Sequence, residues 1–127
     1  MSAFSEALDV TSSGLFAQAT RLRHLSENIA NVDTPGYRRK VLMVEQAPTA
    51  ADAFIATRVE LDETEGERRY DPASPMADGE GYVTSSNVSL VTEMADMREA
   101  NRSYEANLNS FRQARSMYQS LLDILRR

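Results

Sequence analysis

Heptad spacing of apolar side chains at both ends of the chain constrains its fold more than any other feature. Apolar or aromatic residues recur there at alternating steps of four and three, the spacing of a helix that packs along its whole length. The N-terminal stripe comprises Phe4, Leu8, Thr11, Leu15, Gln18, Leu22, Leu25 and Ile29. The C-terminal stripe comprises Leu90, Met94, Met97, Asn101, Tyr104, Leu108, Phe111, Arg115, Tyr118, Leu122 and Leu125. The chain is therefore expected to be mainly α, with two long terminal helices packed as an antiparallel coiled-coil-like pair.

Capping and breaking residues set the expected ends of these helices. The first should begin between Ser2 and Ser5 and end near Asn31, because the Thr34-Pro35-Gly36 sequence cannot continue a helix. The second should begin with Asn87 or Ser89 as its cap and run to about Leu125.

The segment between the helices is expected to be small, irregular and partly β. Residues 37–44 and 54–61 are rich in β-branched and aromatic types and predict two short strands. Residues 47–52 and 71–81 contain proline, glycine and small residues that predict loops. We expect three segments: an N-terminal helix at 1–33, a small β and loop segment at 34–86, and a C-terminal helix at 87–127.

Charge and composition narrow the classes of function. The middle of the chain, residues 41–86, carries ten acidic and three basic side chains, which disfavours nucleic-acid binding. Cysteine is absent and His24 is the only histidine, so no cofactor, metal or catalytic residue is expected and the chain is not predicted to be an enzyme. The acidic run at 60–67 lacks the glycine position of a calcium loop. Without a long apolar run or a signal sequence, neither membrane insertion nor a cleaved signal peptide is expected.

Each helix also has a second face beside its stripe. Small residues precede the N-terminal stripe positions, for example Gly14 and Ala17, and Ala100 and Ala114 do so in the second helix, which then becomes apolar at Met117, Leu121 and Ile124. Such faces would let another backbone approach closely. The pattern is compatible with a simple helical pair on a small sheet, with an adaptor that binds a partner's helix, or with a subunit whose terminal helices pack against copies of itself.

Several ordered strings resemble the bacterial flagellar rod and hook proteins. They are SGLFAQ at 13–18, SENIANV at 26–32 and TPGYRRK at 34–40 near the N-terminus, followed by DPASPMADGEGYV at 71–83, NVSLVTEMADM at 87–97 and RSYEAN at 102–107. The later strings and the short length are similar to the proximal rod members of that family. The compact link at 32–36 is similar to that of one proximal rod protein. The string at 71–83 is similar to that of the neighbouring proximal rod protein. The longer string favours this second resemblance.

The resemblance implies a structural subunit of the basal-body rod that polymerises through its terminal helices. It implies other rod proteins and copies of the chain as partners. It also implies export through the flagellar type III apparatus without a cleaved signal peptide, and a location in the rod within the periplasmic space. The apolar and aromatic stripe residues and Leu121 would serve assembly, and the family motif would be represented by Gly14, Asn28, Asn31, Pro35, Gly36, Tyr37, Arg38 and Arg39. Asn28 and Asn31 are expected to form local or inter-subunit hydrogen bonds or to be solvated. Arg38, Arg39 and Lys40 are expected either to pair with carboxylates of a neighbour or to be solvated.

Overall fold

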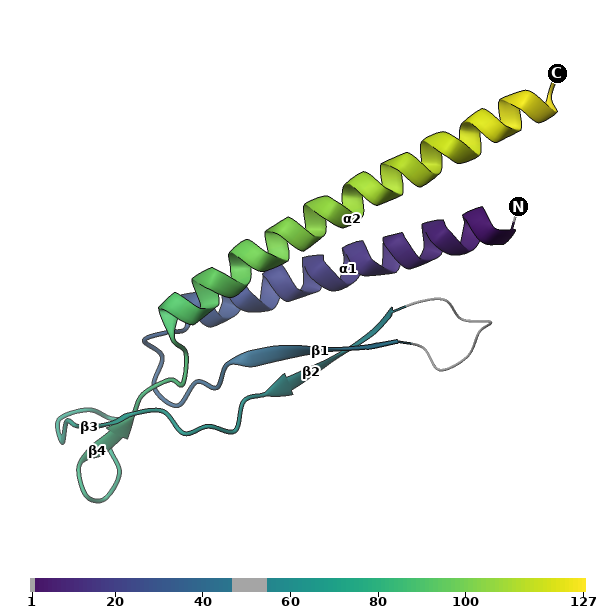
Figure 1. Cartoon of the computed structure of the whole chain (residues 1–127). Helices are drawn as coiled ribbons and strands as arrows, with labels where there is room; N and C mark the ends of the chain where they lie inside the picture. The colour runs from purple at the N-terminus through teal and green to yellow at the C-terminus, as the bar shows by residue number, and fades with distance from the viewer. Residues whose placement is uncertain (1, 47–54) are drawn as a thin grey trace.

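The computed structural model describes residues 2–46 and 55–127 and consists of a long antiparallel helix pair with two small β-hairpins at one side and one end (Figure 1). Its elements are α1 (Ser2–Ala30), β1 (Lys40–Gln46), β2 (Ile55–Leu61), β3 (Arg68–Tyr70), β4 (Tyr82–Thr84) and α2 (Leu90–Leu125). Both termini lie at the same end of the helix pair, which we call the tip (Figure 1). The opposite end, where α1 ends and α2 begins, is the base. The expected fold class is confirmed.

Both helices have nearly the predicted bounds. The Thr34-Pro35-Gly36 sequence follows α1 as a turn in which the amide of Tyr37 donates to the carbonyl of Thr34 at 3.2 Å. Gly36 has a φ of 73°, and the order of proline and then glycine at the central positions is that of a type II turn. Ser89 occupies the N-cap position of α2 as predicted, although its side chain forms no capping hydrogen bond.

The seam between α1 and α2 is made by small residues as well as by the stripes. Ala17 and Ala100 are buried, and a Cβ atom at Gly14 would lie 3.1 Å from Nδ2 of Asn107, which shows how closely the helices approach. At the tip, the rings of Phe4 and Tyr118 lie 6.4 Å apart. Of the alternatives for the small faces, packing against a neighbouring subunit is therefore wrong for Gly14, Ala17 and Ala100. These residues pack within the chain because small side chains allow the two backbones to approach.

The β1–β2 hairpin lies alongside α1, on the side away from α2 (Figure 1). Its strands are antiparallel, with Lys40 opposite Leu61 and Val44 opposite Thr57. The first strand begins three residues later than predicted because residues 37–39 are used in contacts to the helices and to the segment before α2. The second strand was predicted from residue 54, and it is described from Ile55. The predicted loop at 47–52 lies outside the described residues.

A second hairpin, β3 and β4, forms at the base and was not predicted. Its strands have three residues each, too short for a period-two pattern to be visible in the sequence. Val83 is buried, and the rings of Tyr70 and Tyr82 meet edge to face at 5.3 Å. The predicted loop at 71–81 connects the two strands. Gly81, at a φ of 85°, leaves room for the ring of Tyr70, which would lie 3.0 Å from a Cβ atom there.

Candidate functional site

Polar side chains from both helices and from the intervening segment converge at the base. We call this set the base cluster; it comprises Asn28 on α1, Tyr37 and Arg39 before β1, Asn87 before α2 and Glu93 in the first turn of α2. Asn28 and Glu93 have no exposed surface, and they are the largest fully buried side chains among the described residues. Buried polar groups require partners. The cluster supplies them from four segments of the chain.

The Asn28 side chain satisfies all of its hydrogen-bonding capacity. Its Nδ2 donates to the carbonyl of Lys40 at 3.0 Å and to Oε2 of Glu93 at 3.2 Å. Its Oδ1 accepts from the amide of Lys40 at 2.8 Å and from the hydroxyl of Tyr37 at 3.0 Å. An amide has two donors and two acceptor lone pairs, so every position is used. Asn28 thus ties α1 to the start of β1 and to α2, and its predicted hydrogen bonds are formed within the chain.

Arg39 connects the cluster to three carboxylates of the same chain. Its Nε donates to Oε1 of Glu93 at 2.7 Å, and its terminal nitrogens lie 3.5 Å from Asp62 and 3.5 Å from Asp96. Burial lowers the pKa of Arg39, but the hydrogen bond and the charge of Glu93 outweigh this effect and raise the pKa overall. The guanidinium therefore remains charged and neutralises the buried carboxylate.

Asn87 holds the loop between β2 and β3 against the start of β1. Its Oδ1 accepts from the amide of Arg39 at 2.7 Å, and its Nδ2 donates to the carbonyls of Asp62 and Thr64 at 3.0 and 2.8 Å. The amide of Thr64 in turn donates to the carboxylate of Asp62, and this contact is the main reason that the pKa of Asp62 lies below its ordinary value. Asn87 is thus a bridge between segments and not the helix cap that was considered for it.

Lys40 and Asn31 complete the contacts at the end of α1. Nζ of Lys40 lies 2.7 Å from Oε2 of Glu27, and this bond lowers the pKa of Glu27 and raises that of Lys40. Nδ2 of Asn31 donates to the carbonyl of Glu27 at 2.8 Å. Lys40 and Arg39 are therefore paired inside their own chain, which corrects the alternatives of a neighbour's carboxylate or solvent. Arg38 is exposed and has no ion pair among the described residues.

His24 lies beside this region and is buried. Its Nδ1 is 3.4 Å from Oε2 of Glu27, whereas Nε2 has no hydrogen-bond partner in the described part of the protein. Within residues 2–46 and 55–127, no group of three or more acidic or histidine side chains is arranged to hold a metal ion. His24 lines a pocket between α1 and β1 together with Leu25, Val41 and Met43.

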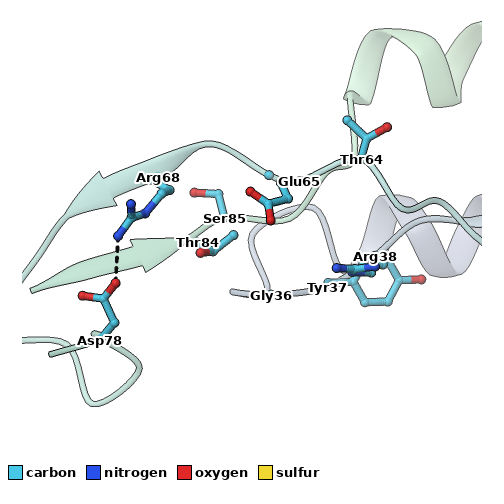
Figure 2. Close-up of a pocket in the computed structure, with 10 residues that line it drawn as sticks. Gly36, Tyr37, Arg38, Thr64, Glu65, Arg68, Asp78, Thr84 and Ser85 are labelled. Carbon is cyan, nitrogen blue, oxygen red and sulfur yellow. Dashed lines mark hydrogen bonds and ion pairs between the residues drawn. The ribbon is translucent and has the colours of Figure 1, made fainter. Parts of the chain in front are cut away.

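A polar groove opens at the base between the turn at 36–38, the loop at 64–66 and the β3–β4 hairpin (Figure 2). It has a volume of about 420 Å³. Arg68 pairs with Asp78 at 2.8 Å on one wall, and the side chain of Glu65 lies near Ser85 on the other (Figure 2). Gly66 is required for this arrangement, because a Cβ atom there would lie 1.8 Å from the carbonyl oxygen of Ser85.

The predicted stripe residues fall into buried, half-buried and exposed groups. Leu25 is buried, and Leu90, Met94 and Leu125 are exposed. The remaining apolar and aromatic ones, and Leu121 beside the stripe, are half-buried: Phe4, Leu8, Leu15, Leu22, Ile29, Met97, Tyr104, Leu108, Phe111, Tyr118, Leu121 and Leu122. Of the polar stripe positions, Thr11 and Gln18 are half-buried, and Asn101 and Arg115 are exposed. The α2 seam therefore follows Glu93 and Ala100 as much as the apolar stripe, since these two lie one heptad apart and have no exposed surface.

Glu93 and Asn87 were not identified from the sequence as functional residues. The signal for Glu93 was its place one heptad before Ala100, where a glutamate on a packing face needs a cation. Asn87 carried no comparable signal, because its partners are 23 to 48 residues away. Within the described residues, α1 and α2 are too polar along their length to serve as membrane spans.

Comparison with known proteins points to the same segments. Residues 8–38 match the family described as "Flagella basal body rod protein", and residues 80–124 match "Flagellar basal body rod FlgEFG protein C-terminal". These two matches contain every residue of the base cluster except Arg39, which directly follows the first match. They define the class as structural proteins of the flagellar rod.

Relatives of full length identify the family within that class. The flagellar basal-body rod protein FlgC of Agrobacterium fabrum is 43% identical, covering 99% of this chain and 98% of its own. FlgC of Aquifex aeolicus is 36% identical over 89% of this chain and 90% of its own, and FlgC of Bacillus subtilis is 30% identical over 98% and 99%. The chain belongs to the FlgC family of flagellar basal-body rod proteins. The resemblance of the 71–83 string is thus confirmed. The compact link at 32–36 had instead suggested FlgB, the neighbouring proximal rod protein.

Proposed function

We propose that this chain is a proximal rod subunit that polymerises through the outer faces of its two terminal helices and helps to form the axial shaft and its channel. Its partners would be copies of itself and other rod proteins. The flagellar type III apparatus would export it without a cleaved signal peptide to the periplasmic part of the rod. The helical segments 1–33 and 87–127 would together form one axial core domain, with 34–86 as a separate small segment.

The exposed apolar side chains of the helices carry this proposal. Phe16 on α1 is 69% exposed, and Val91, Met117 and Ile124 on α2 are 80%, 53% and 66% exposed. Met117 and Ile124 lie one heptad apart and share a face of α2, and large apolar residues grouped on an exposed helix face are typical of protein interfaces. Their positions along both helices suit contacts with neighbours on more than one side.

The base cluster would give these contacts a defined direction. Asn28, Arg39 and Glu93 link α1, β1 and α2, so the hairpin and the helix pair keep a fixed angle at the base. A subunit that transmits torque needs such a rigid joint. The helices beyond the joint have few buried residues and can complete their packing when neighbours bind.

Substitution of exposed apolar residues tests the proposal. Phe16→Asp and Ile124→Asp place a charge on the outer helix faces without removing a buried contact, so the purified chain should keep its fold. We expect incorporation into basal bodies and swimming to fall by about tenfold or more, since a desolvated charge at an interface is costly. Immunoblots of isolated basal bodies and of the exported fraction provide the measurement.

Met76→Asp is the matched control, because Met76 is also exposed and apolar but lies in the 71–81 loop. It should leave incorporation unchanged. Equal incorporation of all three variants would refute assembly through the helix faces. Hydrogen exchange on the monomer separates the rod subunit from an adaptor: we expect fast exchange toward the tip, in residues 2–13 and 101–125, whereas strong protection throughout both helices of a proven monomer would favour the adaptor.

A further inference from the structure

The charges that remain without partners are segregated on the molecule. Arginines that form no ion pair among the described residues lie on α2 and its C-terminal end, apart from Arg38; they are Arg98, Arg102, Arg112, Arg115, Arg126 and Arg127. Glu63, Glu65 and Glu67, on the loop between β2 and β3, are likewise exposed and without an ion pair in the described part of the chain. The other basic residues of the base region are neutralised by nearby carboxylates.

Three of these arginines share one face of α2. Arg98 and Arg102 are four residues apart, and Arg112 follows Arg98 by about four turns, so all three project to the same side. Val91 and Met94, which are exposed, continue this face toward the base, about two turns and one turn before Arg98. We call this the α2 outer face. It presents an apolar patch followed by a row of positive charge.

The end of β2 and the loop that follows it form the complementary surface, an apolar part followed by negative charge. Val59 and Leu61 at the end of β2 are exposed on one face of the hairpin, and the three glutamates follow immediately. Arg38 borders this loop and offsets at most one of the charges. Leu61 and Glu65 are separated by up to about 13 Å of chain, close to the helical rise of about 12 Å between Met94 and Arg102. The segment is therefore long enough for its apolar part to reach Met94 while its charged part reaches Arg102.

We propose that the 61–67 segment of one copy docks on the α2 outer face of a second copy, with its glutamates paired to Arg98 and Arg102. This inference rests on the proposed polymeric function and names one of its contacts. The two surfaces are different parts of the chain, so the contact is heterologous. Repetition of a heterologous contact that does not close on itself generates a helical assembly, which is the geometry that a rod requires.

Cysteine cross-linking tests this contact directly, because the natural chain contains no cysteine. Glu65→Cys and Arg102→Cys are introduced together, and isolated basal bodies are oxidised. We expect a ladder of cross-linked species at multiples of the 14.2 kDa chain. The matched control pairs Glu65→Cys with Ser116→Cys, because the Ser116 side chain is also exposed but lies about 21 Å farther along the helix than Arg102. It should give no ladder.

Charge exchange provides an independent measurement. Incorporation into basal bodies should fall by about tenfold when Glu63→Arg and Glu65→Arg are combined, because like charges then face each other. The same fall is expected when Arg98→Glu and Arg102→Glu are combined. The four substitutions together should restore it, since each copy carries both surfaces. The purified variants are checked for their fold by circular dichroism, and the four natural side chains make no ion pair within the described part of the chain.

The outcomes separate this contact from the function on which it rests. If the unsubstituted chain is absent from basal bodies, the proposed function fails. If it is present but the cysteine pair gives no ladder and charge exchange gives no rescue, the contact is wrong and the function stands. A cross-link from either introduced cysteine to a different protein would overturn the choice of a second copy as the occupant.

Discussion

The base and the tip of the helix pair are held together by different interactions. At the base, Asn28 and Glu93 are fully buried and every hydrogen-bonding position of Asn28 is used. Toward the tip, no residue of α2 after Ala100 is buried among those described, and none of α1 before Gly14. The base is therefore a junction fixed by buried hydrogen bonds, whereas the packing between the two helices toward the tip is incomplete in the single chain.

This difference follows from the energetics of the two kinds of contact. A buried polar network is stable only in one arrangement, because a displaced partner leaves an unpaired group at a cost of about 1–3 kcal/mol. Half-exposed apolar contacts such as the ring pair of Phe4 and Tyr118 tolerate small shifts. The chain can thus keep its base geometry while its helices adjust to neighbours.

Removing Glu93 should have the largest effect on the stability of the isolated chain. Glu93→Ala leaves the partly buried Arg39 without its closest carboxylate and leaves a donor of Asn28 unpaired. We expect the free energy of unfolding to fall by about 3 kcal/mol. Urea unfolding followed by circular dichroism measures this change. Glu99→Ala, which removes an exposed carboxylate 3.7 Å from Arg21, is the control and should cost less than about 1 kcal/mol.

Removing the Asn28 side chain should have the next largest effect. Asn28→Ala removes four hydrogen bonds and leaves the amide and carbonyl of Lys40 without their partners, for an expected loss of about 2–3 kcal/mol. Asn31→Ala is matched in chemistry but acts at the half-exposed end of α1, and should cost about 1 kcal/mol. Equal losses for the two variants would contradict the distinction between the base cluster and its surroundings.

Truncation in the seam toward the tip should cost less than truncation at the base. Phe111 is half-buried, so Phe111→Ala should lower the free energy of unfolding by about 1–2 kcal/mol, compared with about 3 kcal/mol for Leu25→Ala at a buried position. The same urea series gives both values. A larger loss for Phe111 would mean that the seam is already well packed in the monomer, and the proposed completion by neighbours would lose its support.

Mild acid should produce the smallest effect, and it should act away from the tip. Bonds from Lys40, from the amide of Thr64 and from the amide of Tyr82 lower the pKa values of Glu27, Asp62 and Asp78, respectively. The unfolded chain binds these protons at a higher pH, so this stabilisation is present above about pH 4 and is lost as the pH falls further. The urea concentration at the unfolding midpoint should decrease from about pH 7 to about pH 4 and again to about pH 3, and this decrease should be less steep in Glu27→Gln. An unchanged slope in that variant would remove Glu27 from this account.

The parts of the fold that were predicted correctly depend on neighbours in the sequence. Heptad spacing and the Thr34-Pro35-Gly36 turn specify where the helices run and where α1 ends, because a proline and a glycine act on their own backbone. The first strand was predicted too early because residues 37–39 have strand-like side chains but use their polar groups on the helices and on Asn87. Strands β3 and β4 were too short to give a periodic signal.

The composition of the seam could not be predicted to the same degree. A stripe identifies the packing side of a helix, but residues about 100° apart can share that side, and small ones allow closer approach. Ala17 and Ala100 therefore pack within the chain, while Met94 and Leu90 remain exposed. The partners of Arg39 and Lys40 were misplaced for a different reason, because Glu93 and Glu27 lie 54 and 13 residues away from them in the sequence.

The sequence by itself determined two terminal helices, an acidic middle and membership of a rod and hook class, since these are properties of local spacing, composition and ordered strings. Only the tertiary structure decided which charges are neutralised and which remain available. Asn28 meets Glu93 across 65 residues, and no local pattern records such a contact. The physical reason is that burial and pairing depend on distances in space, which the chain sets only after the helices have packed.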